Sequence, residues 1–383
     1  MMARLVVATL AKGSGMGRFS VELANAIEQA GAEVLFIAPE QEHRLAVSQV
    51  ERTIWPTRRG GLLQKIILAS VSLDLARRIV RPCGGDAPML MIAIAPTLPI
   101  SLVPIIVAKL TRAKIALSLH DFYPHSYRFP KRFAGLERAL YRWAYRRFDA
   151  IMTNNEQQTG RLIAEAGVPA PRIATLYHGV FTVPDIQPAA ADDETNLLIF
   201  GSLRPNKQVL ESIKAVVALR ARGVKVRLHI AGAPRREDAA YWQSCLAVLP
   251  ADDAAFHVEA RFIDEAELPS ILSGVHAFLC PYSAFDSQSG VSMMAVSNGV
   301  PMIATLAARP PSLRETDESW VQVAPEGDVA AISTAIEAFI AMPFAQRLAA
   351  AEAARGRLQD EAGWPRLARL YLEAMQARGF WKK

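Results

Sequence analysis

The chain alternates short apolar runs with segments of helical period, and it does so twice. In the first half the apolar runs are RLVVATL, AEVLFIAP, MLMIAIA, AKIALSLH and DAIMTNN, and helical patterns such as GRFSVELANAIEQAG separate them. A strand that is apolar along its whole length is buried on both faces, and such strands alternate with helices in parallel sheets. The first half therefore predicts a doubly wound α/β domain.

The same alternation restarts after a stretch without periodicity. The segment PDIQPAAADDETN is rich in proline, alanine and aspartate, which predicts a linker over 184–196. Beyond it the apolar runs NLLIFGSL, VRLHIAGA, FHVEARF, AFLCPY, PMIATL and WVQVAP predict a second parallel sheet. We expect two Rossmann-like α/β domains, 1–183 and 197–361, that face a central cleft at the carboxyl ends of their strands. The amphipathic WPRLARLYLEAMQARG predicts a helix in 362–383 that packs back on the first domain.

Composition excludes several other classes of protein. The 383 residues are 51% hydrophobic and 21% charged, without internal repeats or low-complexity tracts, as in a globular protein. Cys83, Cys245 and Cys280 are far apart, with neither a CxxC motif nor a matching histidine cluster, which predicts neither disulfides nor a zinc site. The uncharged run 87–108 is interrupted by prolines, so a strand, a turn and a helix explain it better than a membrane span. We expect a cytoplasmic protein whose net charge of +6, concentrated in the first half, favours an anionic partner.

A glycine-rich segment, AKGSGMGRFS, follows the first predicted strand and opens the first predicted helix. Gly13, Gly15 and Gly17 would let backbone amides approach an anion, although a tight strand-to-helix turn explains these glycines equally well. A dinucleotide-binding fingerprint would need glycine where Arg18 stands, which counts against a dehydrogenase.

Polar residues also follow the fourth apolar run, in SLHDFYPHSY. His120 and Asp121 stand where a strand ends, and there polar side chains are costly in a core but useful in a cleft. We therefore interpret His120 as functional, whereas His125 is compatible with a surface position.

Two later segments predict a phosphate site. In IFGSLRPNKQVLESIKAV, Arg204 and Lys207 lie between a strand and a helix, where cations oppose the helix dipole unless an anion is bound. In FDSQSGVSMMAVSNGVP, the first amides of the predicted helix, at about Ser289 to Val291, can hold phosphate. A serine N-cap at Ser287 or Ser289 is compatible with that role.

Taken together, these motifs resemble the GT-B glycosyltransferases, and most closely the glycosyltransferase family 4 type of bacterial polysaccharide assembly. The resemblance covers nearly the whole chain and includes the closing GVP motif, Gly299 to Pro301, and the segment RFIDEAELPSILSGVHAFLCPY. It implies that His120 contacts the transferred sugar and that Phe262 and Ile263 lie near the base. The donor-binding residues that it implies are Gly15, Gly17, Arg204, Lys207, Phe262, Ile263, Gln288, Ser289, Gly290 and Val291.

The sequence departs from this family at the usual pair of glutamates, which fall on Asp286 and Met294. Asp286 is still an acid and is implied to bind sugar hydroxyls as a catalytic residue beside His120. Met294 cannot accept the two strong hydrogen bonds that the family glutamate receives from the ribose. This variant has Gln288, Ser289 and Gly290, in a QSGV loop, where other members have a Gly-Phe-Gly type of sequence.

Basic and apolar residues predict a membrane or acceptor surface. Trp55, Arg58 and Arg59 begin WPTRRGGLLQKIILASVSLDLARRIVR, which has the composition of an interfacial helix. Arg138 and Arg142, followed by Arg146, form a row of like charges in KRFAGLERALYRWAYRRF that either an anionic surface or acids such as Asp149 would neutralise. On the same helix we expect four residues in the core: Phe133, Leu136, Leu140 and Ala144.

The resemblance implies a metal-independent, retaining hexosyltransferase without a cofactor. Its donor would be a UDP- or GDP-sugar, and its acceptor a polyprenyl-diphosphate-linked or growing polysaccharide at the inner face of the plasma membrane, in exopolysaccharide or cell-surface glycan synthesis. A sugar-nucleotide epimerase of the same fold and a non-catalytic partner that binds a nucleotide sugar or a lipid are the alternatives. Nucleic-acid binding is disfavoured, because the basic rows lack an aromatic platform.

Overall fold

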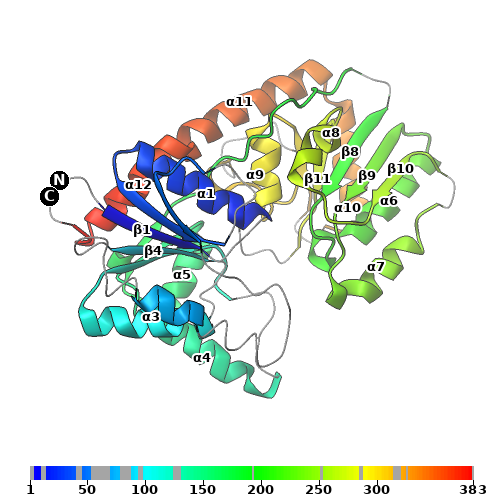
Figure 1. Ribbon diagram of the computed structural model, residues 1–383. Helices are drawn as coiled ribbons and strands as arrows, with labels where there is room; N and C mark the ends of the chain where they lie inside the picture. The colour runs from blue at the N-terminus through cyan, green and yellow to red at the C-terminus, as the bar shows by residue number, and fades with distance from the viewer. Residues whose placement is uncertain are drawn as a thin grey trace. The chain divides into compact units, whose positions relative to one another are not determined.

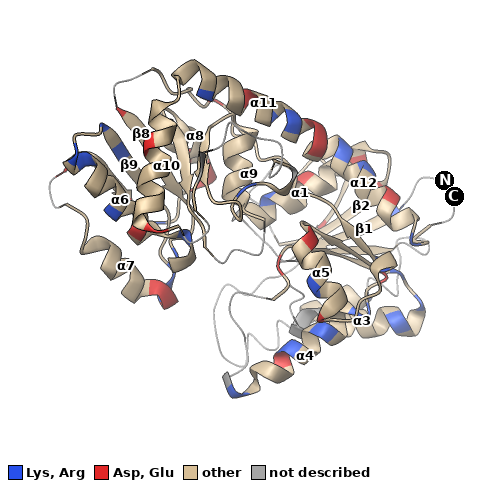
Figure 2. Ribbon diagram, turned by 180° about the vertical axis from the view of Figure 1, so that it is seen from behind, with Lys and Arg blue, Asp and Glu red and all other residues tan. Residues whose placement is uncertain are grey.

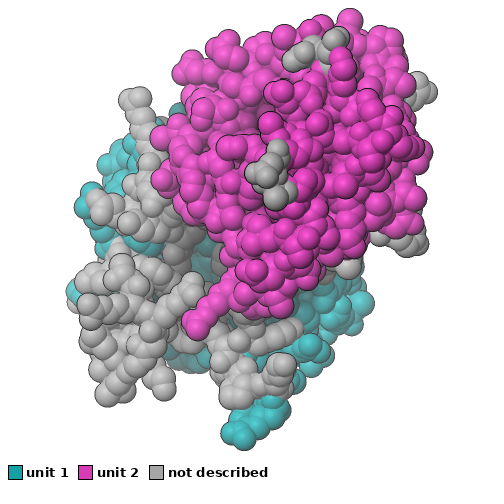
Figure 3. Space-filling view, turned by 90° about the vertical axis from the view of Figure 1, so that its right-hand side faces the viewer, with its two compact units in different colours: residues 1–179, 363–383 teal, residues 180–362 magenta. Residues whose placement is uncertain are grey.

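The computed structural model describes residues 4–9, 14–39, 45–52, 70–77, 88–93, 98–123, 131–191, 194–250, 253–283, 288–313, 321–324 and 327–381. The chain divides into two compact units, which Figures 1 and 3 show. Unit 1 combines residues 1–179 with 363–383, and unit 2 comprises residues 180–362. The chain thus leaves unit 1 once and returns to it once.

Unit 1 contains a parallel sheet of seven strands in the order β3-β2-β1-β4-β5-β6-β7. The strands are β1 (Arg4–Thr9), β2 (Glu33–Ala38), β3 (Gln49–Arg52), β4 (Met89–Ala93), β5 (Ile115–Leu119), β6 (Ala150–Thr153) and β7 (Ile173–Thr175). All five predicted apolar runs of the first half are strands. The sequence analysis missed β3, which is exposed at every position, and the short β7.

Helices cover both faces of this sheet (Figure 1). They are α1 (Ser14–Gln29), α3 (Leu98–Thr111), α4 (Ala134–Tyr145), α5 (Glu156–Ala164) and α12 (Trp364–Gln376), with 3-10 turns at Lys131–Phe133 and Ala170–Arg172. Alternate residues of β1 separate the two cores. Leu5 and Val7 face the core that contains α1 and α12, whereas Val6 and Ala8 face the core that contains α3 and α4.

The last helix, α12, belongs to unit 1. Tyr371 is buried against the sheet, and its hydroxyl lies 2.7 Å from Ser118 Oγ. The two points at which the chain passes between the units are distant in sequence but lie side by side in space. A Cβ at Gly179 would come within 2.4 Å of the Trp364 ring, and Val180 N–H donates to Ala362 O at 3.3 Å. The units therefore divide after Gly179 and after Ala362. Unit 2 thus includes the segment predicted as a linker, 184–196, together with the predicted second domain, 197–361.

Unit 2 contains a parallel sheet of six strands in the order β10-β9-β8-β11-β12-β13. The strands are β8 (Thr195–Phe200), β9 (Val226–Ala231), β10 (Phe256–Glu259), β11 (Ala277–Cys280), β12 (Met302–Ala304) and β13 (Val321–Gln322). Each of the six apolar runs predicted for the second half contains one of these strands. Because β8 and β11 are neighbours, the loops that follow them meet at one edge of the sheet.

The helices of unit 2 are α6 (Val209–Ala221), α7 (Ala239–Leu246), α8 (Leu268–Leu272), α9 (Gly290–Ser297), α10 (Val329–Ala341) and α11 (Phe344–Ala362). Its 3-10 turns are Pro205–Lys207, Arg236–Asp238, Glu265–Glu267 and Pro311–Leu313. Ile213 of α6 and Ile336 of α10 pack with Leu197 and Leu228 in one core beneath the sheet. Over the part of the chain that the structure describes, no single helix has the length and apolar composition of a membrane span, although the bent pair Val329–Ala341 and Phe344–Gln376 meets that criterion together.

Candidate functional site

The most unusual charge in unit 2 is the ammonium group of Lys207, in the 3-10 turn that follows β8. Its side chain is only 4% exposed, and Nζ donates to Phe200 O at 2.7 Å. The Tyr282 ring lies 5.3 Å from Nζ. Burial is the main cause that lowers the pKa of Lys207 to about 7; Cys280 opposes this shift in part, and the positive charge of Arg204 adds to it. A buried lysine with a lowered pKa is typical of a functional site. An anion that binds beside such a lysine favours its charged form.

Arg204 and the amino end of α9 lie at the same edge of the sheet. Arg204 precedes the 3-10 turn and directs the chain into it with extended backbone. Ser289 caps α9, its side chain accepting from Ser292 N–H at 3.2 Å. The loops after β8 and β11 are joined directly, since Ser283 N–H donates to Asn206 O at 2.9 Å. The structure therefore brings together two basic residues and a capped helix end, the arrangement that binds a phosphate.

Three glycines that the sequence analysis did not assign allow this close packing. Gly201 has φ +89°, and a Cβ there would lie 3.1 Å from Lys207 Nζ and 3.3 Å from a methyl group of Val291. Gly232 has φ +149°, and its Cβ would overlap the carbonyl oxygen of Gly201. A Cβ at Gly327 would overlap the side chain of Gln208. For Gly201 and Gly232, their position directly after a strand was the only signal available in the sequence.

The segment that the resemblance assigned to the base follows β10 at the same edge of the sheet. Phe262 is 61% exposed, whereas Ile263 is buried. Arg261 holds the segment in place, since its guanidinium binds Glu259 and pairs with Glu267 at 2.6 and 2.9 Å. An exposed aromatic ring on an anchored turn can stack on a base.

The QSGV loop, residues 288–291, runs into the start of α9. Gln288 Nε2 lies 2.9 Å from Met293 Sδ, and Gly290 and Val291 form the first positions of the helix. Met294 is buried, 5% exposed, inside α9. A buried methionine therefore stands where the resemblance implies the family glutamate.

In unit 1, His120 directly follows β5, as predicted. It is buried, 8% exposed, and its ring contacts Phe19 of α1 edge-on at 4.5 Å and His178 at 5.6 Å. Burial holds the pKa of His120 well below its usual range, and His178 lowers it further. His120 is therefore neutral at pH 7.

Asn154, after β6, fixes the tautomer of His120. Asn154 Nδ2 donates to His120 Nδ1 at 3.2 Å, so the ring proton is on Nε2. Gln158 Nε2 donates to the His120 carbonyl oxygen and holds its backbone. Among the residues that the structure describes, neither His120 Nε2 nor Asn154 Oδ1 has a hydrogen-bond partner. This pair presents one donor and one acceptor to a polar ligand.

The predicted glycine loop is helical where it is described. Helix α1 begins at Ser14, so Gly15 and Gly17 lie in its first turn, four and two residues before Phe19, whose ring contacts His120. A Cβ at Gly15 would meet no atom within 4 Å, so packing within unit 1 does not require this glycine. The first amides of an α-helix have no partner within the helix, so the start of α1 has the geometry to hold an anion.

Helix α4 lies on the other side of the sheet from α1. Arg138 is exposed, and Arg142 is partly exposed one turn later; Figure 2 shows basic positions along α4. The expectation that Phe133 and Leu136 are core residues is wrong, because they are 45% and 56% exposed. The buried face of α4 is instead formed by Glu137, Tyr141, Ala144 and Tyr145, while Leu140 packs at its margin.

Several predicted residues lie outside the described part of the chain. They are Gly13, Trp55, Arg58, Arg59, His125, Asp286 and Ser287. Their roles stay predictions.

Two family models match the chain, one in each half. The model described as Glycosyltransferase Family 4 matches residues 13–182, and the model described as Glycosyl transferases group 1 matches residues 194–342. Together they cover most of both units and identify the chain as a glycosyltransferase of the GT-B fold, with a family 4 first domain and a group 1 second domain. No curated protein matches the chain in sequence.

Solved structures share the whole fold at low sequence identity. HepE of Anabaena, in complex with UDP and glucose, has a TM-score of 0.71 and 16% identity over 98% of this chain and 100% of its own. Sucrose-phosphate synthase of Thermosynechococcus elongatus has a TM-score of 0.68 and 15% identity over 98% and 100% of the two chains. A glycosyltransferase of Rickettsia africae has a TM-score of 0.66 and 12% identity over 98% of each chain. These likenesses show that the two parallel-sheet domains form a GT-B fold.

Proposed function

We propose that this glycosyltransferase takes its sugar from a nucleoside diphosphate sugar and gives it to a lipid-linked or growing polysaccharide. The observation that carries the proposal is the buried Lys207 beside Arg204 and the capped amino end of α9, which together suit a diphosphate. HepE, which shares the fold, has been solved with UDP and with UDP-glucose.

In this proposal, Lys207 and Arg204 neutralise the charge that develops on the leaving diphosphate. The amides at Ser289 to Val291 would bind the same group, and Phe262 would stack on the base. Fixed positive charge of this kind stabilises a leaving group without a metal ion. Metal independence and retention of the anomeric configuration are carried over from the family resemblance.

His120 is proposed to contact the sugar through its Nε2–H. Because the ring is neutral and its tautomer is set by Asn154, it donates a hydrogen bond without adding charge. Asp286 is proposed to bind sugar hydroxyls, as the resemblance implies. With Met294 buried, the ribose would be held by other groups.

The proposed lipid-linked acceptor requires contact with the inner face of the membrane. Exposed apolar residues on helix α3 and at the start of α4 support such a contact: Ile106 and Leu110 are 46% and 79% exposed, and Phe133 and Leu136 are 45% and 56% exposed. Arg138 of α4 would supply positive charge for anionic headgroups. This surface adds to the one predicted for Trp55, Arg58 and Arg59.

Calorimetric titration with the diphosphates of uridine, guanosine and adenosine, and with their sugars, tests the donor assignment. One base class should bind and, at a hundred times its Kd, stabilise the protein by roughly 2.7 kcal/mol. The variant Lys207→Met should lose most of this binding, whereas Lys214→Met, at an exposed position of α6, should not. If no nucleoside diphosphate or its sugar binds, the proposed donor is wrong.

A further inference from the structure

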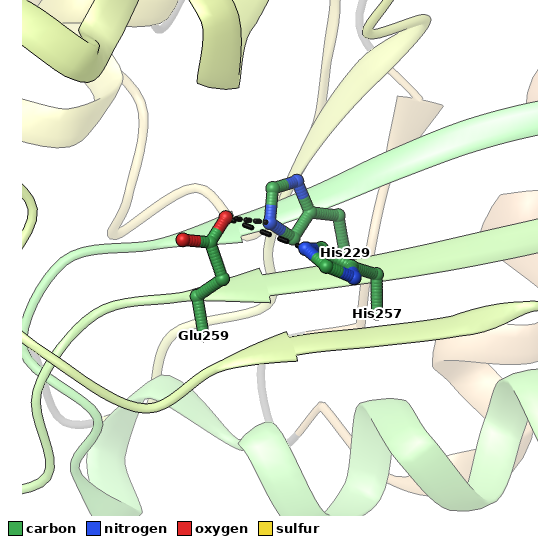
Figure 4. A group of neighbouring side chains, drawn as sticks. All are labelled: His229, His257 and Glu259. Carbon is green, nitrogen blue, oxygen red and sulfur yellow. Dashed lines mark hydrogen bonds and ion pairs between the residues drawn. The ribbon is translucent and has the colours of Figure 1, made fainter.

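Two histidines and a glutamate from neighbouring strands of unit 2 converge at one place (Figure 4). His229 of β9 is directly opposite His257 of β10 in the register of the parallel pair. Glu259 lies two residues beyond His257, so its side chain points to the same face of the sheet. Glu259 Oε1 lies 3.1 Å from His229 Nε2 and 3.4 Å from His257 Nε2.

These separations match the spacing of ligand atoms around a small metal ion. With bonds of about 2.0–2.1 Å to nitrogen and oxygen, two ligands of a tetrahedral zinc ion are about 3.3 Å apart. The three candidate ligand atoms all lie within 4.8 Å of one another.

Arg261 orients the carboxylate of this cluster. Its guanidinium binds Glu259 Oε2, which leaves Oε1 directed at the two imidazoles. Glu267 pairs with the same guanidinium and offsets its positive charge. A hydrogen-bonded partner that fixes a ligating carboxylate is a common feature of metal sites.

An ion can reach the cluster from solvent. The side chain of His257 is 67% exposed, and those of His229 and Glu259 are 21% and 20% exposed. The imidazole rings lie 4.6 Å apart without stacking, at an angle of 58°. The open side of His257 leaves space for a water molecule as a further ligand.

We propose that His229, His257 and Glu259 form a zinc site with two imidazole ligands, one carboxylate ligand and a solvent ligand. Imidazole and carboxylate are ligands that zinc prefers, and three protein ligands with one open position are a common zinc arrangement. The ion would join the edge strand β10 to β9. This site was not predicted from the sequence. His229 and Glu259 are 30 residues apart, and the ligands come together only because β9 pairs with β10.

Zinc titration of the full chain tests the site directly. Tag-free protein is stripped with a chelator and titrated with Zn²⁺ by calorimetry and with Co²⁺ by visible absorption. We expect one equivalent to bind, with the intense d–d absorption of a four-coordinate Co²⁺ ion and a higher thermal midpoint in zinc. No saturable binding would overturn the proposal.

Variants locate the bound ion. His229→Ala, His257→Ala and Glu259→Gln should each weaken zinc binding at least about tenfold, since even the loss of groups that support a ligand costs that much. Glu267→Gln also removes a carboxylate from Arg261 but spares the three ligands, so it should keep strong binding. His257 is mostly exposed, so its variant should fold. If His257→Ala and Glu259→Gln bind zinc as tightly as the native chain, the ion is elsewhere and the assignment fails.

Discussion

Replacing Lys207 with methionine should make the protein more stable at neutral pH and worse at binding its donor. Lys207 is buried, with only 4% of the residue exposed. Methionine is an unbranched side chain of similar length, but it lacks the ammonium group. The substitution therefore separates the cost of burying a charge from the use of that charge in binding.

The magnitude follows from the pKa of this lysine. Its pKa falls from 10.5 to about 7 on folding, so between these values the unfolded chain binds more protons and stability rises with pH. At pH 7 this shift in the pKa of Lys207 lowers the free energy of unfolding by roughly 4 kcal/mol. Methionine removes that loss, but it also removes the hydrogen bond to Phe200 O, which costs about 1–3 kcal/mol. We expect Lys207→Met to be more stable by about 1–3 kcal/mol at pH 7 and less stable near pH 10.5.

Urea unfolding of both proteins at several pH values between 7 and 10.5, followed by circular dichroism, measures the difference. Lys214→Met serves as the control, since it makes the same substitution at an exposed position of α6. In parallel, calorimetry should show that Lys207→Met weakens nucleoside diphosphate binding about 10- to 150-fold, the equivalent of a charge-assisted contact of about 1.5–3 kcal/mol. A stability difference that does not change with pH would refute the argument from the buried charge.

Three further variants test other parts of the molecule. Changing Phe133 and Leu136 together to aspartate should reduce sedimentation with anionic vesicles several-fold, whereas Leu246→Asp, at an exposed apolar position of unit 2, should not; equal losses would point to nonspecific adhesion. Met294→Glu should lower the thermal midpoint without restoring ribose binding, because a buried carboxylate costs several kcal/mol; tighter nucleotide binding at an unchanged midpoint would contradict this. Because burial lowers the pKa of His120, the unfolded chain is protonated first as the pH falls below 6.5 and stability decreases; His120→Gln should show a smaller decrease between pH 7 and pH 5 in urea titrations, and equal decreases would be inconsistent with that pKa.

The apolar runs predicted most of the fold because parallel strands are buried on both faces. β3 carried no such signal, since all four of its residues, Gln49–Arg52, are exposed at the edge of the sheet. On α4 the apolar period was misleading. Leu136 is exposed while the neighbouring Glu137 is fully buried, so the packing of this helix overrides its hydrophobic pattern.

The candidate site could be predicted only where its residues lie shortly after a strand. His120 follows β5 directly, and Arg204 and Lys207 lie in the loop and the 3-10 turn that follow β8. Asn154 could not be paired with His120 in advance, because their contact depends on the pairing of β5 with β6. The histidines of the proposed zinc site depend in the same way on the register between β9 and β10.

The return of the chain to unit 1 has a consequence for its synthesis. α12 covers part of the sheet of unit 1 with Leu367, Tyr371 and Met375, but the ribosome makes it only after all of unit 2. Unit 2, which is one continuous segment, has its full set of strands and helices before unit 1 does. A nascent chain therefore exposes the apolar surface of α1 and of the first sheet that α12 later covers until α12 emerges, and apolar surface exposed in this way favours aggregation.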